Sequence, residues 1–271
     1  PMKHPISDVS RRTVSRTIAG AALAGLAGCL GGSGTTQLGS QDQFSSVAVE
    51  GTKLVVELVE GAEVEQINLI RPNGELFGQR TVAAGTEQVS FELRTSYTPG
   101  EYRVVALNGE ESVSEVTTEI NPSVEIKEIG LFRNYPNKPW DEIYGNTQTD
   151  RLKNGEVFVT VENTGTGPES ITKLYFTGDV PNPVENPWNN GIYNFERVIL
   201  APGEETDLFS NSFPFGSVSE SGLGCSLTTN RGRFKVALET ETRDKELTTS
   251  YDVRYSGSQE MSDCKITITE V

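Results

Sequence analysis

Histidine and cysteine, the side chains most often used for catalysis and metal binding, are scarce in this chain. Its 271 residues include a single histidine, His4, and three cysteines, Cys29, Cys225 and Cys264. His4 lies in an N-terminal segment that we expect to be removed on export. Without it no Ser-His-Asp triad, Cys-His pair or His-ligated metal site can form. We therefore predict that the protein is not an enzyme and has no catalytic residues, no metal site and no cofactor.

Cys225 and Cys264 are predicted to form a disulfide. If Cys29 carries a lipid, these two cysteines remain as an even pair, and an exported protein reaches an oxidising compartment. The ring that they close is long, and the chain-entropy model assigns such a cross-link about 4 kcal/mol of stability. The alternative is two free, buried thiols.

Two aromatic, proline-rich segments, residues 131–153 and 178–195, contain both tryptophans of the protein. Flat side chains on stiff loops can stack on sugar rings or contact a protein partner. In the alternative interpretation, the aromatic residues bury one another and form a small satellite core beneath the loops. The candidate binding residues are Trp140, Tyr144, Trp188 and Tyr193.

The same two segments contain carboxylates of the kind that calcium prefers: Asp141, Glu142, Asp150 and Asp179. Their spacing matches no EF-hand. Acidic residues are also expected everywhere on the surface of a protein with this charge. A glycosidase would need two acids held across a cleft, which spacing along the chain does not establish. Calcium binding therefore stays open, without a predicted metal ligand.

Charge and composition exclude one class of partner. Thirty-eight acidic residues against 23 basic residues leave a net charge of −15. A protein of this charge is a poor match for the nucleic-acid backbone, so we expect no nucleic-acid partner. A hydrophobic content of 35% is enough for modest cores, and the length fits one or two domains.

The N-terminus has the features of an export signal. Arg11 and Arg12 precede a weakly apolar run over residues 17–28, which is shorter than the roughly 20 residues of a membrane-spanning helix. Small residues then precede Cys29. The segment resembles a twin-arginine signal that ends in a lipobox, which implies that residues 1–28 are removed and that Cys29 is lipidated. The alternative is an amphipathic or core helix followed by a glycine-rich linker.

Removal of residues 1–28 would make the chain more acidic. That segment has four basic residues against Asp8, so 19 basic and 37 acidic residues remain, and the net charge becomes −18. An acidic, twin-arginine-exported lipoprotein resembles the secreted lipoproteins of halophilic archaea, in which dense carboxylates keep the protein hydrated in salt. This implies a cell-surface protein anchored by its lipid to the outer face of the cytoplasmic membrane. The alternative is an ordinary acidic bacterial surface protein.

After the signal, the polar, glycine-rich residues 29–43 indicate the lipidated cysteine and a flexible linker. From residue 44 the apolar residues alternate with a period of two, in short runs separated by turns such as Asn108-Gly109. We expect an antiparallel sandwich over residues 44–120. The segment 97–104 resembles the Pro-Gly-x-Tyr-x-Val strand of Ig-like surface modules.

A second set of alternating runs follows Asn121-Pro122, so we place a domain boundary there and a second sandwich over residues 121–271. The run 156–167 resembles the Val-x-Val-x-Asn-x-Gly strand and turn of CARDB-like, fibronectin-like cell-adhesion modules. Residues 200–205 resemble the Leu-x-Pro-Gly-Glu turn of the same modules. The long aromatic segments depart from that pattern.

These patterns predict an all-β chain of two antiparallel Ig-like β-sandwich domains after a signal peptide and flexible linker. The predicted function is that of a lipid-anchored cell-surface protein with a non-enzymatic adhesion, envelope-structural or binding role. Its expected partners are the membrane, through the lipid, and an envelope protein or glycan. The alternative is a secreted carbohydrate-active enzyme, or a polysaccharide-binding accessory module that uses the aromatic loops.

Overall fold

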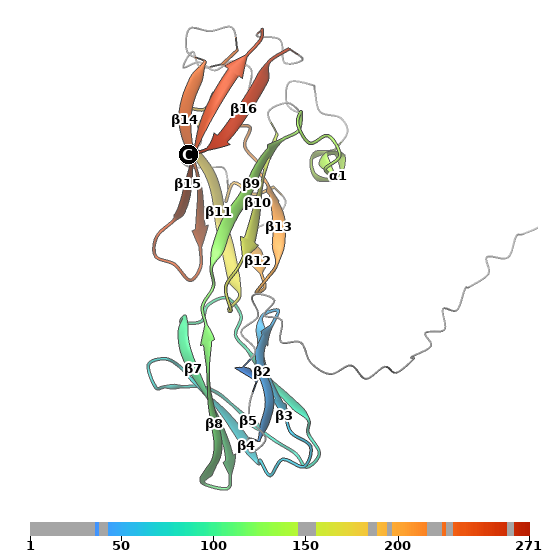
Figure 1. The fold of residues 1–271 in the computed structure, drawn as a ribbon, viewed down its shortest axis with the longest axis vertical. Coiled ribbons are helices and arrows are strands. Elements are labelled where there is room, and N and C mark those ends of the chain that lie inside the picture. Colours follow the sequence, from blue (N-terminus) through green and yellow to red (C-terminus); the bar gives the residue numbers. More distant parts are fainter. Residues whose placement is uncertain are drawn as a thin grey trace, which may run out of the picture. The chain divides into compact units, whose positions relative to one another are not determined.

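The computed structural model describes residues 36–37, 43–145, 156–183, 189–193, 197–215, 224–225, 230–258 and 263–271. The predicted signal segment, Cys29, most of the linker, Asp150 and Trp188 lie outside the described residues. Within the described ranges the chain is built of antiparallel strands and one five-residue helix (Figure 1). The all-β prediction is confirmed. In the same part of the chain, no helix has the length and apolar character needed to cross a lipid bilayer.

The first sandwich is built from two four-stranded sheets that share one core. The first sheet has the order β1-β2-β3-β6 and the second the order β5-β4-β7-β8. Leu54, Phe91, Ile67 and Tyr102 come from both sheets and are buried in the same cluster. The strands of the first sheet are β1 (Thr36–Gln37), β2 (Phe44–Glu50), β3 (Lys53–Leu58) and β6 (Gln88–Glu92). Those of the second are β4 (Gln66–Ile70), β5 (Leu76–Thr81), β7 (Gly100–Asn108) and β8 (Glu111–Ile120).

The predicted Asn108-Gly109 turn joins β7 to β8. Asn108 lies opposite Glu111 in the register, and Gly109 has a φ of 61°, a conformation that costs glycine little. Along β8, inward residues such as Val116 alternate with exposed ones. This alternation is what a sheet with one solvated face requires.

The second sandwich has a three-stranded sheet, β13-β10-β9, and a five-stranded sheet, β12-β11-β14-β15-β16. Val159, Phe176, Val236 and Tyr255 belong to its common core. The strands of the smaller sheet are β9 (Val124–Leu131), β10 (Val157–Asn163) and β13 (Glu205–Phe209). Those of the larger sheet are β11 (Glu169–Gly178), β12 (Val198–Leu200), β14 (Arg231–Thr240), β15 (Leu247–Ser256) and β16 (Lys265–Glu270).

The predicted disulfide between Cys225 and Cys264 is confirmed, with a sulfur–sulfur distance of 2.03 Å. Both cysteines are buried in the second core. Cys264 directly precedes β16, the strand at the edge of the larger sheet. The cross-link therefore joins this edge strand to the chain before β14.

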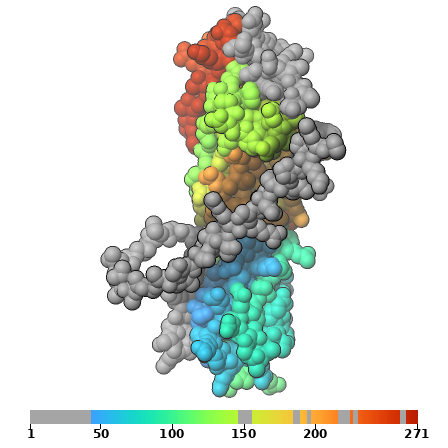
Figure 2. All heavy atoms as spheres, turned by 90° about the vertical axis from the view of Figure 1, so that its right-hand side faces the viewer, coloured from blue at the N-terminus to red at the C-terminus, as the bar shows by residue number. Residues whose placement is uncertain are grey.

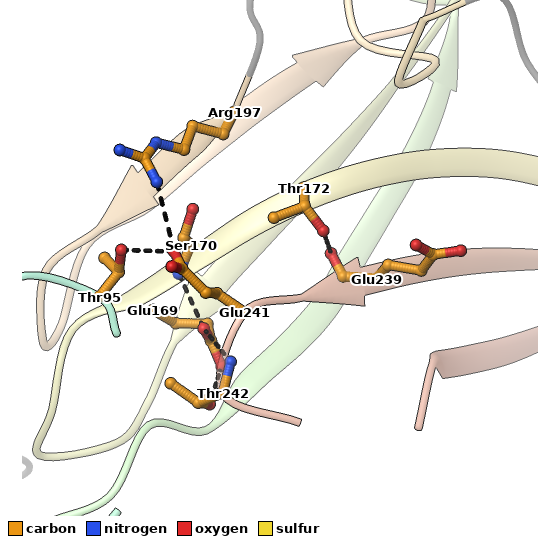
Figure 3. A network of polar contacts seen from close by, with 8 residues as sticks. All are labelled: Thr95, Glu169, Ser170, Thr172, Arg197, Glu239, Glu241 and Thr242. Atoms are coloured by element: carbon orange, nitrogen blue, oxygen red, sulfur yellow. Dashed lines mark hydrogen bonds and ion pairs between the residues drawn. The ribbon is translucent and has the colours of Figure 1, made fainter. Parts of the chain in front are cut away.

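The two cores draw on separate stretches of the chain, and polar contacts connect them. The Tyr97 hydroxyl donates a hydrogen bond to the carbonyl of Pro168 at 3.0 Å. Figure 3 shows a second group of contacts, in which the Thr95 hydroxyl donates to the Glu241 carboxylate at 2.6 Å. The same carboxylate lies 3.4 Å from an Arg197 nitrogen. Glu241 thus links a loop of the first sandwich to the second.

Beside Glu241, a fully buried carboxylate is satisfied by its neighbours. Glu169 is 0% exposed, and it accepts hydrogen bonds from the backbone N–H of Ser170 at 2.8 Å and from the hydroxyl of Thr242 (Figure 3). A buried charge without partners would be strongly destabilising. These bonds therefore give Glu169 a structural role at the start of β11.

Candidate functional site

Residues 131–145 of the first aromatic segment fold onto the outer face of the smaller sheet of the second sandwich (Figure 2). This segment contains a short helix, α1 (Trp140–Tyr144), where the sequence pattern predicts a loop. Trp140 and Tyr144 are buried with Phe158 and Phe209, and Phe132, Tyr135, Ile143 and Tyr193 pack around them. We call these eight residues the aromatic cluster.

The aromatic cluster exists because β10 carries apolar side chains on both faces. Val157, Val159 and Val161 point into the main core, so Phe158 points the other way and needs a cover. In the register, Phe158 lies between Gly130 on β9 and Phe209 on β13. Trp140 of the α1 segment covers the Phe158 ring. The centroid of the Trp140 ring lies 5.2 Å from that of the neighbouring Phe209.

The two buried polar side chains of the aromatic cluster, Trp140 and Tyr144, donate to backbone carbonyls. The indole N–H of Trp140 donates to the Tyr135 carbonyl at 2.7 Å, and the Tyr144 hydroxyl donates to the Ser210 carbonyl at 2.6 Å. Burial, with a smaller contribution from the Glu156 charge, raises the pKa of Tyr144 well above its ordinary value. The phenol therefore stays protonated at neutral pH and serves as a donor.

An ion pair closes one side of the aromatic cluster. The Lys138 ammonium lies 2.5 Å from the Asp207 carboxylate and 4.5 Å from the centroid of the Phe158 ring. The Thr160 hydroxyl donates to the other oxygen of Asp207 at 2.7 Å. These contacts fix the loop before α1 on the sheet.

Three of the four candidate aromatic residues can be placed. Trp140 is 3% exposed and Tyr144 is 7% exposed, so neither presents a ring face to solvent. Tyr193, from the second aromatic segment, is half-buried, with its ring centroid 4.6 Å from that of Tyr144. The structure therefore brings the two segments together, and packing accounts for the buried pair.

The acidic residues of the two segments that the structure describes are Asp141, Glu142 and Asp179. Among the described residues, no group of three or more His, Cys, Asp or Glu side chains is placed to hold a metal ion. Asp179 instead accepts a hydrogen bond from the backbone N–H of Arg233 at 3.1 Å. Its carboxylate thus holds the turn after β11 to the start of β14.

A second candidate site, absent from the sequence-based predictions, lies on the outer face of the larger sheet. Figure 1 labels the strands of that sheet. An open groove of about 720 Å³ runs over β14, β15 and β16. We call it the basic groove, and its polar lining residues are Arg231, Arg233, Asp252, Arg254, Thr267 and Thr269.

The strand register assembles the basic groove in two rows. Arg231, Arg254 and Thr267 form one row, and Arg233, Asp252 and Thr269 form the next. All six residues are exposed. The signal in the sequence is the alternation of basic residues in Arg231-Gly-Arg-Phe-Lys235, which places every second side chain on one face. Only the pairing of β14 with β15 adds Arg254.

No family model matches the chain, and no curated protein matches it. Among solved structures it is similar to a glycosyl hydrolase family 2 member from Bacteroides cellulosilyticus, with 15% identity over 73% of this chain and 24% of that one (TM-score 0.20). It is also similar to a two-domain fibronectin type-III segment from chicken tenascin, with 14% identity over 85% and 98% of the two chains (TM-score 0.26). A third similar structure is the BSP domain of a biofilm associated protein, with 15% identity over 83% of this chain and 28% of that one (TM-score 0.23).

The chain spans only 20–24% of the length of glycoside hydrolases of this kind. At TM-scores of 0.20–0.26, these similarities assign neither a family nor an activity.

Proposed function

We propose that this is a lipid-anchored cell-surface protein with a non-enzymatic role in adhesion, envelope structure or binding. In this proposal Cys29 carries the lipid, the glycine-rich residues that follow it form the tether, and the two sandwiches face outward from the cytoplasmic membrane. The twin-arginine and lipobox pattern supports the anchor. The net charge of −18 after signal removal supports a halophilic archaeal surface.

The observation that carries the non-enzymatic role is the packing of Trp140 and Tyr144 in the aromatic cluster together with the hydrogen bonding of the buried Glu169. A glycosidase needs two carboxylates on either side of a bound sugar. The arrangement supports a scaffold that presents outer surfaces.

Alanine substitutions test this against the carbohydrate-active alternative. Trp140→Ala should lower the free energy of unfolding by about 3–5 kcal/mol, because it removes a buried ring. Trp188→Ala and Tyr193→Ala serve as the matched pair from the second segment. If these two variants lose a polysaccharide cleavage activity of the parent while their stability is unchanged, the aromatic loops are a catalytic carbohydrate site and the proposal is wrong.

The anchor is tested independently with Cys29→Ser. Because the thiol is the point of lipid attachment, this variant should appear in the medium whereas the parent protein stays with the membrane. Mass spectrometry of the membrane-bound parent protein provides the control. An unmodified Cys29 thiol in that fraction would overturn the lipid anchor.

A further inference from the structure

The basic groove concentrates positive charge on an acidic protein. Arg231, Arg233 and Arg254 line it, and the exposed Lys235 and Lys265 lie on the same outer face of the sheet. The chain as a whole carries a charge of −15. We therefore ask why basic side chains gather at this place on a protein whose acidic residues outnumber its basic ones.

The stability of the sheet does not explain why these basic residues are clustered. Arg231 and Arg254 are directly opposite each other on neighbouring antiparallel strands, where like charges are destabilising. Arg233 forms an ion pair with Asp252 at 2.9 Å. Among the described residues, neither Arg231 nor Arg254 has an ion-pair partner, so their guanidinium groups are available to a ligand.

The basic groove is open along its length, so a ligand would lie along the sheet instead of being enclosed. Its volume of about 720 Å³ lies within the range of roughly 300–1,000 Å³ that is usual for ligand sites. The two rows of side chains lie about 7 Å apart along the strand direction. An extended ligand can therefore meet one row after the other.

The mixture of groups in the basic groove selects the ligand chemistry. Arginine binds carboxylate and sulfate oxygens through paired N–H donors. Thr267 and Thr269 both donate and accept, and Asp252 accepts only. A carboxylate beside the arginines would repel a continuous phosphate backbone, but it can accept hydrogen bonds from hydroxyl groups. The lining therefore suits a molecule that carries both anionic groups and hydroxyls.

We propose that the basic groove over β14, β15 and β16 binds an anionic polysaccharide through its sulfate or carboxylate groups. Arg231 and Arg254 hold the anionic group of one sugar unit. Arg233, Asp252 and Thr269 contact the hydroxyl groups of the next. This inference rests on the proposed non-enzymatic binding role, for which it names the ligand class, and it does not depend on the lipid anchor.

The test is a titration of the purified full chain with dextran sulfate, with neutral dextran of the same length as the reference. Dextran sulfate should bind at low salt, and the affinity should fall as KCl is added because salt screens exposed charges. Arg231→Gln/Arg254→Gln should weaken binding by about tenfold or more, since two charge-assisted contacts are lost.

The matched control is Lys53→Gln/Arg103→Gln, which removes the same charge from exposed strands of the first sandwich. It should change the affinity by about twofold at most, because distant charges are screened. The Arg231→Gln/Arg254→Gln variant should melt at the same or a higher temperature than the parent, because a like-charge pair is removed. A melting temperature below that of the parent protein would give the arginines a structural role and overturn the proposal.

Three other results would also overturn it. These are equal losses of affinity in both double variants, equal binding of neutral dextran, and binding to anionic phospholipid vesicles without binding to dextran sulfate. Cleavage of the polymer would instead overturn the non-enzymatic role while the site stands. The two proposals therefore fail on different readouts.

Discussion

The ring of Phe158 lies against the backbone of Gly130, which its register position on the neighbouring strand places directly opposite. A Cβ atom at position 130 would lie 2.2 Å from Cε1 of Phe158 and 2.8 Å from Cδ2 of Tyr135. Glycine at this point of β9 therefore lets the aromatic cluster close over the sheet. The need for glycine here comes from packing.

Gly130→Ala should therefore destabilise the protein by about 1–3 kcal/mol, which is the usual cost of overpacking a core. Denaturant unfolding measures it. Phe158→Leu in the same chain should recover part of the loss, because the smaller side chain leaves room for the methyl group. Gly78→Ala is the control, since its Cβ would lie 3.2 Å from the nearest ring atom. Equal losses in the two glycine variants would contradict the packing argument.

The disulfide should be both protected and strongly stabilising. Cys225 and Cys264 are buried, so alkylating agents should label them only after reduction. Replacement of both by alanine should lower the free energy of unfolding by about 4 kcal/mol, because the unfolded chain regains the entropy of a long open loop. Labelling of both thiols in native, unreduced protein would contradict the bond.

High pH should weaken the second sandwich through its buried tyrosines. Burial, with a smaller contribution from Glu270, raises the pKa of Tyr251 from 10.0 to about 12. The folded state therefore holds this proton more tightly than the unfolded state. The resulting stability is fully present below pH 10 and is lost as the pH rises from about 10 to about 12.

Tyr251→Phe tests this directly, since phenylalanine keeps the ring that stacks on Phe234 at 5.5 Å. At neutral pH the variant should match the parent to within about 1 kcal/mol. Above pH 10 its stability should fall less steeply than that of the parent. Parallel curves for the two proteins across that range would count against the Tyr251 contribution.

Salt should stabilise the protein because its acidic residues repel one another. Glu101 and Glu119 are exposed and directly opposite on β7 and β8, a destabilising arrangement. The Debye length falls from about 30 Å at 0.01 M to about 3 Å at 1 M salt. The melting temperature should therefore rise between dilute buffer and molar KCl.

Glu101→Lys should flatten that rise, because it turns the repulsive pair into an attractive one. Glu92→Lys is the contrasting variant, since Glu92 already forms an ion pair with Lys53 at 2.8 Å. It should lower the melting temperature at low salt. A melting temperature of the parent that stays flat across the salt series would argue against both the repulsion and a halophilic origin.

Most strands were predictable because their burial alternates. In β7, Tyr102, Val104 and Ala106 are buried while their neighbours face outward, and this period of two is visible in the chain. β11 was not predicted, because buried residues such as Ser170, Ile171 and Phe176 give it nearly continuous burial with an irregularity in its pairing. A strand that is covered on both faces loses the alternation that would identify it.

The aromatic segments show what depends on contacts between distant residues. Their composition made them candidate sites and left packing open as the alternative, but their surroundings were not visible in the sequence. Trp140 is buried because β10 presents Phe158 on its outer face and β13 adds Phe209 beside it. An aromatic residue can pack in a core or bind a ligand. Which of the two it does depends on the surface that the rest of the chain places beneath it.

The chain's own residue pattern was sufficient for its all-β class, its turns and the pairing of its last two cysteines. These follow from local alternation, from residues that tolerate turn conformations, and from the even pair of cysteines that is left if Cys29 carries a lipid. The basic groove needed the folded sheet. Arg231 and Arg254 are more than twenty positions apart in the chain, and they become neighbours only because antiparallel pairing sets the register of β14 against β15. Register is a property of two strands together, and neither strand alone contains it.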